Sequence, residues 1–227
     1  MNFIKFLTLL LMGAFVHVLN AQECNQEKIL IIGAYETPLS FLNYAKEEVD
    51  SIAMIASSQK VMLLEGEDAT LEKIDKVKSF APSIVHISSN GFLLPNNKDY
   101  IIPLYGKEKL ELTEDKSDIK SGSYFKISEF NQIFPNGINM VVISSSESNN
   151  PVVIEVLKNA GVKSAILSTH TLDDEIAFIF MTNFYKNYLN GMTKQEALQQ
   201  AQKSVRETPG FEDPEYWAAF ILLDALN

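Results

Sequence analysis

The chain has 227 residues, 46% of them hydrophobic, with 29 Asp or Glu and 19 Lys or Arg, so its formal charge is −10. This length and apolar content suit one domain with a sizeable core, and the acidic balance argues against nucleic acid as a partner. A single cysteine excludes an intramolecular disulfide, and so few histidines argue against a His/Cys metal cluster. We therefore expect no metal and no cofactor.

The amino-terminal segment has the pattern of a secretory signal peptide. Lys5 precedes an apolar stretch that runs to Leu19 without an acidic residue, and Ala21 offers a small residue at the cleavage site. The stretch is shorter than the about 20 apolar residues of a membrane span. Cleavage after Ala21 is expected, with an uncleaved anchor as the alternative. It leaves 206 residues with a formal charge of −11, secreted or periplasmic and free of the membrane.

Residues 1–21 are assigned to the signal peptide, and the short stretch that follows them is polar. Residues 22–27 contain the only cysteine, Cys24, and are expected to be a disordered terminus, so Cys24 has no expected catalytic role. No linker or repeat interrupts residues 28–227. These residues are predicted to form a single domain.

Five short apolar runs alternate with amphipathic segments along this domain. The runs are near-continuous, as in strands buried on both faces, and the segments between them have helical spacing. The predicted strands are 28–33, 61–64, 84–89, 140–143 and 164–168, and the first predicted helices are about 38–58, 70–80 and 152–160. The alternation predicts a mostly parallel sheet covered by helices on both faces.

The carboxyl-terminal part is predicted to be helical, with a break and a final strand. Gly191 marks the break, and Thr193 with Glu196 forms a capping box that restarts the helix. The apolar run 216–223 is predicted as a sixth strand. Residues 95–123 are rich in polar side chains, and we interpret them as a hairpin-like excursion over the carboxyl edge of the sheet.

Ligands of open parallel sheets bind beyond the carboxyl ends of the strands. The third and fourth predicted strands end in the sequences Val85-His86-Ile87-Ser88-Ser89-Asn90-Gly91 and Ile143-Ser144-Ser145-Ser146-Glu147-Ser148. These sequences resemble the CHAT domains, which are caspase- and separase-related cysteine peptidases. The family has apolar-His-x-x-x-His-Gly on the third strand and Leu-Ser-Ala-Cys-x-Thr/Ser on the fourth.

The resemblance covers about residues 28–226 and includes Ala45-x-x-Glu48 on the first helix. It implies a caspase-like three-layer α/β/α sandwich with a mostly parallel six-stranded sheet. It also places the family's general base at Asn90 and its nucleophile at Ser146, so this chain is a degenerate member with both positions substituted.

The two substitutions argue against peptidase activity on chemical grounds. A thiol is partly ionised near neutral pH, whereas a serine hydroxyl needs an adjacent base, and an asparagine amide takes up no proton. We therefore expect no catalytic residue here. The expected function is an exported pseudo-peptidase that binds a peptide or protein segment in the cleft.

Five residues are candidates for binding in that cleft. Main-chain N–H groups near Gly91 and Ser146 form the analogue of an oxyanion hole, and Asp173 and Asp174 lie where the family has a pocket acid. The alternative is that Thr171 or Asp173 caps the next helix. The candidates are Gly91, Ser145, Glu147, Asp173 and Asp174.

Two other functions remain open. One is a hydrolase or peptidase with Ser146 as nucleophile and His170 as a relocated base, oriented by Asp173 or Asp174. The other is a structural or assembly protein with a vestigial cleft. We interpret His86 as a hydrogen-bonded core residue and Glu48 as a surface or capping charge.

Overall fold

The structure is a computed structural model that describes residues 26–37, 40–134 and 137–226. The predicted signal peptide and Cys24 lie outside the described residues. Gln26 and Glu27, assigned to the disordered terminus, are described: Gln26 Nε2 donates to the Ser58 carbonyl oxygen at 2.7 Å, and the Glu27 N–H donates to Gln59 Oε1 at 2.8 Å.

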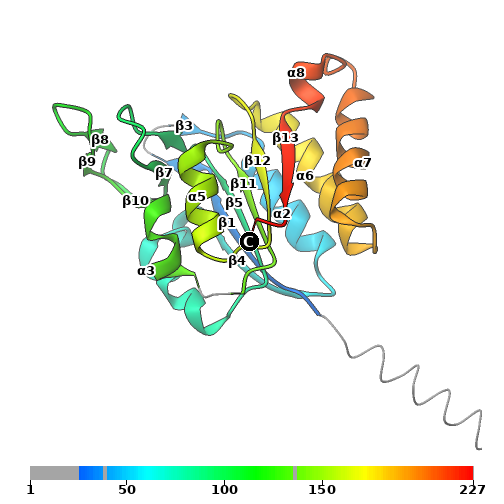
Figure 1. Ribbon diagram of the computed structural model, residues 1–227, viewed down its shortest axis with the longest axis horizontal. Helices are drawn as coiled ribbons and strands as arrows, with labels where there is room; N and C mark the ends of the chain where they lie inside the picture. The colour runs from blue at the N-terminus through cyan, green and yellow to red at the C-terminus, as the bar shows by residue number, and fades with distance from the viewer. Residues whose placement is uncertain (1–25, 38–39, 135–136, 227) are drawn as a thin grey trace, which may run out of the picture.

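A six-stranded sheet forms the middle layer (Figure 1). Its order is β13-β12-β11-β5-β1-β4, and only β13 is antiparallel to its neighbour. The strands are β1 (Lys28–Ala34), β4 (Lys60–Glu65), β5 (Ile84–Ser89), β11 (Met140–Ser144), β12 (Ser164–Ser168) and β13 (Phe220–Asp224). The five predicted parallel strands are therefore confirmed. Every residue of β5, β11 and β12 is buried, which explains why these sequences are apolar without alternation.

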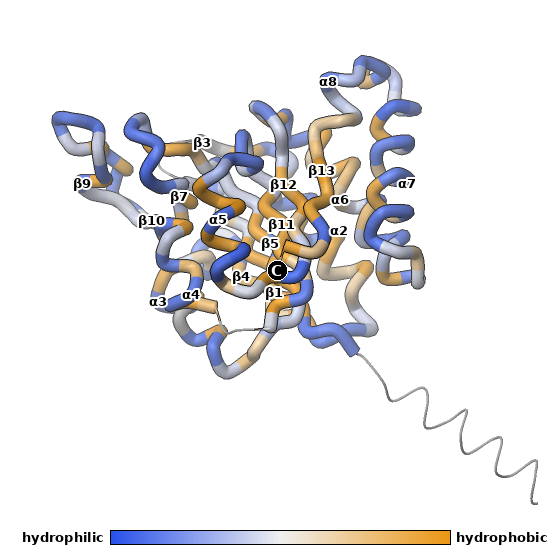
Figure 2. Tube along the Cα trace, in the orientation of Figure 1, coloured by the Kyte–Doolittle hydropathy of each residue, from blue (hydrophilic) through white to orange (hydrophobic). Residues whose placement is uncertain are grey.

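Helices cover both faces of the sheet, which confirms the three-layer prediction. One face packs against α2 (Ala45–Ile55), α6 (Asp174–Leu189) and α7 (Lys194–Arg206). The other packs against α3 (Leu71–Asp75), η2 (Lys76–Ser79), η3 (Ile127–Glu129), α4 (Phe130–Ile133) and α5 (Pro151–Asn159). Figure 2 shows hydrophobic residues concentrated along the strands and polar residues on the outer helices.

The polar excursion is built from small antiparallel sheets. A three-stranded sheet has the order β10-β7-β6, and β8 pairs with β9. The strands are β6 (Phe92–Leu93), β7 (Tyr100–Pro103), β8 (Glu111–Leu112), β9 (Ile119–Ser121) and β10 (Tyr124–Lys126). In Figure 1 they lie together at one side of the main sheet. Tyr100 connects them to the carboxyl edge of the main sheet, because its hydroxyl donates to the Ser146 carbonyl oxygen.

Two predicted boundaries are wrong. The first helix begins at Ala45, because β2 (Glu36–Thr37) and β3 (Ser40–Phe41) pair as a hairpin before it. The run 216–223 is not one strand, since α8 (Pro214–Trp217) takes its first residues. A short 3₁₀ turn, η1 (Gly66–Asp68), follows β4. Within the described part of the chain, no helix is both long and apolar enough to cross a membrane.

Candidate functional site

The ends of β5 and β11 lie side by side, because Ser88 pairs with Ser144 in the parallel ladder. This brings Asn90-Gly91 next to Ser145-Ser146. The Gly91 N–H donates to Ser145 Oγ at 2.6 Å, and a Cβ at Gly91 would lie 2.7 Å from that oxygen. Only glycine fits this approach without displacing its neighbours. Of the two expected oxyanion-type donors, the Gly91 N–H is therefore already hydrogen-bonded within the chain.

Tyr100 closes the site from the excursion. Its hydroxyl lies 2.9 Å from Ser145 Oγ and donates to the Ser146 carbonyl oxygen at 2.7 Å. The side chain is completely buried, and burial raises the pKa of its phenol, so the hydroxyl stays protonated as a donor at neutral pH. Tyr100 thus fixes the position of the loop that carries Ser146.

Ser146 is half-buried, and its hydroxyl is held by a main-chain group. Ser146 Oγ accepts a hydrogen bond from the Leu172 N–H at 3.0 Å. Within the described residues, no titratable side chain hydrogen-bonds to this hydroxyl. The main-chain N–H of Ser146 also has no hydrogen-bond partner among these residues. The Leu172 N–H therefore fixes the position of the serine hydroxyl.

A small polar cavity of about 30 Å³ lies between Asn90 and Ser146. Its polar lining consists of Glu48, Ser88, Ser89, Asn90, Ser144, Ser145, Ser146 and Asp174. This volume accommodates about one or two water molecules. Among the described residues, no group of three or more His, Cys, Asp or Glu side chains is arranged to hold a metal ion.

Glu48, which lines this cavity, contacts the buried His86. Glu48 Oε1 lies 2.9 Å from His86 Nε2, and Tyr185 Oη lies 3.3 Å from His86 Nδ1. Ser88 Oγ and Ser144 Oγ donate to Glu48 Oε2 at 3.4 and 3.2 Å. Burial, with the Glu48 charge as a second cause, raises the pKa of Tyr185, so its hydroxyl donates to Nδ1 and leaves Nε2–H for Glu48.

This network confirms His86 as a hydrogen-bonded core residue and corrects the interpretation of Glu48. Glu48 is 1% exposed and is neither a surface charge nor a helix cap. It lies on the buried face of α2 with Ala45, Val49 and Ile52.

His170 lies near the site, but its ring nitrogens have other partners. Nδ1 lies 2.8 Å from Thr169 Oγ1, and Nε2 lies 2.8 Å from the Glu215 carbonyl oxygen. Because a carbonyl only accepts, Nε2 carries a proton and donates it to the Glu215 carbonyl oxygen, while Nδ1 is paired with the Thr169 hydroxyl. Ser146 Oγ is not among the hydrogen-bond partners of this ring.

The two candidate acids have defined local roles. Asp173 caps α6, with Oδ1 accepting from the Glu175 N–H at 2.9 Å, as the alternative interpretation predicted. Asp174 Oδ2 accepts from the Tyr44 N–H at 2.9 Å and lines the first cavity. Asp173 lines a second cavity of about 60 Å³ with His170, Glu215 and Tyr216. The exposed Glu147 donates its N–H to the His170 carbonyl oxygen.

The chain is similar to known proteins in both sequence family and fold. The model of the CHAT domain matches residues 9–225, beginning inside the predicted signal peptide. The chain belongs to the CHAT domain family. Among solved structures, it is similar to the crystal structure of the Arg specific cysteine proteinase gingipain R, with a TM-score of 0.60 and 12% identity. That match covers 87% of this chain and 46% of the proteinase, so this chain spans less than half of its length. No curated protein matches the chain.

The CHAT assignment makes this a peptidase-related domain with a caspase-like fold. The motif-based alignment puts Asn90 and Ser146 at the dyad positions, and the structure brings these residues to one cavity. Of the candidate binding residues, Gly91 and Ser145 are hydrogen-bonded to each other, from the Gly91 N–H to Ser145 Oγ. Asp174 lines the cavity of Asn90 and Ser146, Asp173 lines the second cavity, and Glu147 lines neither.

Sequence reasoning missed two residues of this CHAT site. Tyr100 lies in the excursion, and nothing in its local sequence indicates a contact with residues 45 positions away. Glu48 had a usable signal: it shares the helical spacing of Ala45, Val49 and Ile52, which places it on the apolar face.

Proposed function

We propose that this protein is an exported, non-catalytic CHAT domain that binds a peptide or protein segment instead of cleaving one. The observation that carries the proposal is the state of Ser146, whose hydroxyl accepts from the Leu172 N–H while asparagine occupies the base position. Loss of the base removes help worth about 10²- to 10⁴-fold in rate. Loss of the thiolate removes the better nucleophile as well.

The rim of the cleft favours a basic ligand. Asp173, Asp174 and Glu215 line the two cavities, and the chain as a whole carries a formal charge of −10. Because the cavities measure only about 30 and 60 Å³, a bound segment lies across the mouth of the cleft. A lysine or arginine side chain then reaches the carboxylates, and the free Ser146 N–H donates to a carbonyl oxygen of the ligand.

The binding experiment uses terminally blocked peptides that contain arginine, with glutamine in the matched control peptide. The protein variant is Asp173→Asn with Asp174→Asn, because asparagine keeps both hydrogen bonds to main-chain N–H groups and removes only the charges. Affinity for the arginine peptide is expected to fall, by about 0.2–1 kcal/mol for each exposed pair. Unchanged affinity in the variant would place the ligand elsewhere.

The hydrolase alternative is supported by one observation, the position of His170 next to the Ser146 loop, where its carbonyl oxygen accepts from the Glu147 N–H at 3.1 Å. Catalysis requires the ring to leave both Thr169 and the Glu215 carbonyl group. A fluorophosphonate probe tests this directly. We expect no labelling of the purified protein. Labelling that disappears in both Ser146→Ala and His170→Ala would establish a hydrolase instead.

Export is part of the proposal and rests on the sequence of residues 1–21. Mass spectrometry of protein isolated from its native host is expected to show a chain that begins at Gln22. Recovery of soluble protein that still carries Met1 contradicts export.

A further inference from the structure

Two hollows larger than the cleft lie together on another part of the surface. Their volumes are about 420 and 440 Å³, and Leu71 and Glu129 line both. One is bounded by Gly106, Lys107, Glu108, Gly122, Ser123 and Tyr124, and the other by Glu72, Lys78, Gln132 and Ile133. We call the two hollows together the β10 groove. It runs between α3 and the segment from β10 to α4.

One wall of the β10 groove is a strand with a free edge. β10 is the last strand of its sheet and pairs only with β7. The Leu104 N–H donates to the Ser123 carbonyl oxygen, so these two residues form a hydrogen-bonded pair of the ladder. Hydrogen-bonded and non-hydrogen-bonded pairs alternate in an antiparallel ladder. Phe125 and Ile102 are therefore the next hydrogen-bonded pair, and Tyr124 and Pro103, between them, are a non-hydrogen-bonded pair. The N–H and C=O of Tyr124 therefore point away from β7. Neither group has a hydrogen-bond partner in the rest of the described structure.

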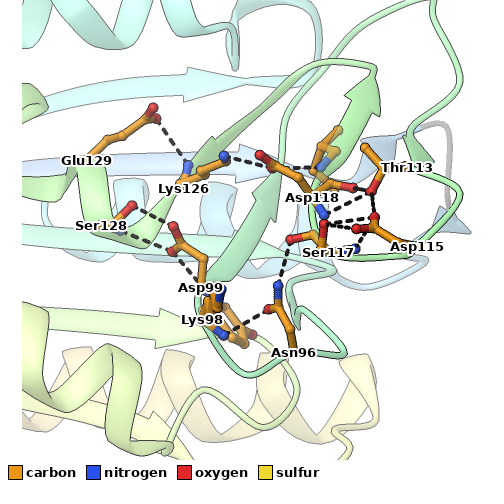
Figure 3. Close-up of polar contacts among 12 residues, drawn as sticks. Asn96, Lys98, Asp99, Thr113, Asp115, Ser117, Asp118, Lys126, Ser128 and Glu129 are labelled. Atoms are coloured by element: carbon orange, nitrogen blue, oxygen red, sulfur yellow. Dashed lines mark hydrogen bonds and ion pairs between the residues drawn. The ribbon is translucent and has the colours of Figure 1, made fainter.

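The groove also contains a carboxylate without a cation. Glu129 Oε2 accepts from the Lys126 N–H at 3.2 Å, while the Lys126 ammonium lies 2.7 Å from Asp118 Oδ1 (Figure 3). The hydrogen bond to the Asp118 carboxylate holds the pKa of Lys126 above its usual value, so the ammonium of Lys126 stays charged and paired to Asp118. No ion pair involves Glu129 among the described residues. Glu129 is half-buried, so its charge is only partly compensated by water.

The opposite wall supplies an apolar contact. Leu71 is 43% exposed, one of the few large apolar side chains that are open to solvent in the described part of the chain. It lies at the start of α3, and Thr70 caps that helix by accepting from the Lys73 N–H. A free strand edge, an unpaired carboxylate and an exposed leucine thus face one groove.

We propose that the β10 groove binds an extended peptide as an additional strand along β10, with a lysine or arginine side chain of the peptide paired to Glu129. Main-chain hydrogen bonds to Tyr124 supply affinity, and an apolar side chain of the peptide contacts Leu71. Charge selects the occupant. A second copy of this chain carries a formal charge of −10, and the groove has three carboxylates, of Glu72, Glu108 and Glu129, against the two ammonium groups of Lys78 and Lys107. A basic peptide is complementary, whereas a second acidic chain is not.

The experiment uses bead libraries of blocked octapeptides with alternating apolar residues and a fixed central arginine, glutamine or glutamate. Purified protein is expected to be retained most by the arginine library. Glu129→Gln keeps the bond to the Lys126 N–H and removes the charge, so it should reduce the arginine preference about five-fold. The control Glu114→Gln removes an exposed carboxylate outside the groove and should change nothing.

The strand geometry is tested on the peptide and on the protein. N-methylation of the best peptide's main chain should abolish binding, and Tyr124→Pro, which removes an N–H from an edge strand, should weaken it. Equal retention by all three libraries, or a preference that survives Glu129→Gln, overturns the proposal. A preference lost in the Asp173→Asn, Asp174→Asn variant but kept in Glu129→Gln assigns binding to the cleft. The groove and the cleft are therefore tested independently.

Discussion

At the residue scale, the buried Glu48 network is the strongest constraint on the shape of the site. Its carboxylate is contacted by His86 Nε2, Ser88 Oγ and Ser144 Oγ. Glu48→Ala leaves these donors without their acceptor, and each buried unsatisfied donor costs about 1–3 kcal/mol. Urea denaturation should therefore show a clearly lower free energy of unfolding.

The neighbouring residue provides the control for that prediction. Glu47 is exposed on the same helix turn, and Glu47→Ala should change stability by less than about 0.5 kcal/mol. Equal effects of the two substitutions would mean that the network contributes nothing specific to stability.

The same residues show what a sequence reveals about a site and what it does not. The motif positions of Asn90 and Ser146, and the core role of His86, follow from short local patterns. The contacts that hold the site together join residues far apart in the chain: Glu48 with Ser144 across 96 positions, and Tyr100 with Ser146 across 46. Local periodicity carries no information about such pairs, so these roles required the structure.

At the element scale, caps and periodicity predicted most helices and strands, and the errors fall where short elements meet. Asp213 accepts from the Glu215 N–H, and Pro214 occupies the first turn of α8, which are ordinary helix-start features. The apolar run that follows does not distinguish a one-turn helix plus strand from a longer strand. The sequence therefore predicts one strand over the whole run.

The capping box of α7 gives a prediction at this scale. Thr193 Oγ1 accepts from the Glu196 N–H at 3.2 Å, and Glu196 Oε2 accepts from the Thr193 N–H at 2.9 Å. The N–H and the hydroxyl of Thr193 both donate to Glu196 Oε2, and these two bonds lower the pKa of Glu196. Thr193→Ala should reduce the free energy of unfolding by about 1 kcal/mol. Thr171→Ala, at an exposed residue that caps no helix, is the matched control. A Thr193→Ala protein as stable as the control would show that the cap contributes nothing.

At the scale of the whole molecule, the sheet order brings together the site and the excursion. Sequence periodicity predicted parallel strands covered on both faces, and the family resemblance implied a six-stranded sheet, but the order β13-β12-β11-β5-β1-β4 came only from the structure. The excursion is joined to the sheet by the buried Tyr100 and by Ser89 Oγ, which donates to the Pro103 carbonyl oxygen at 2.7 Å. Its position depends on tertiary contacts that no local pattern encodes.

The buried tyrosines predict how the stability of the whole domain depends on pH. Burial raises the pKa of Tyr100 and Tyr185 in the folded protein, whereas both phenols titrate near about pH 10 once unfolded. Above that pH the unfolded chain releases protons that the folded chain retains, so unfolding becomes more favourable as the pH rises. The stabilising effect is complete below about pH 10 and is lost progressively above it.

Urea denaturation between about pH 9 and pH 11 measures this loss, which reaches up to about 1.4 kcal/mol per pH unit for each buried phenol. Tyr100→Phe removes one titrating group, so its stability should fall less steeply with pH than that of the unmodified protein, even though the variant starts lower because it lacks the bond to Ser146. Tyr44→Phe, at an exposed tyrosine, should keep the steeper slope. If Tyr100→Phe and Tyr44→Phe have the same slope, the Tyr100 phenol is not held protonated at the closed edge of the sheet.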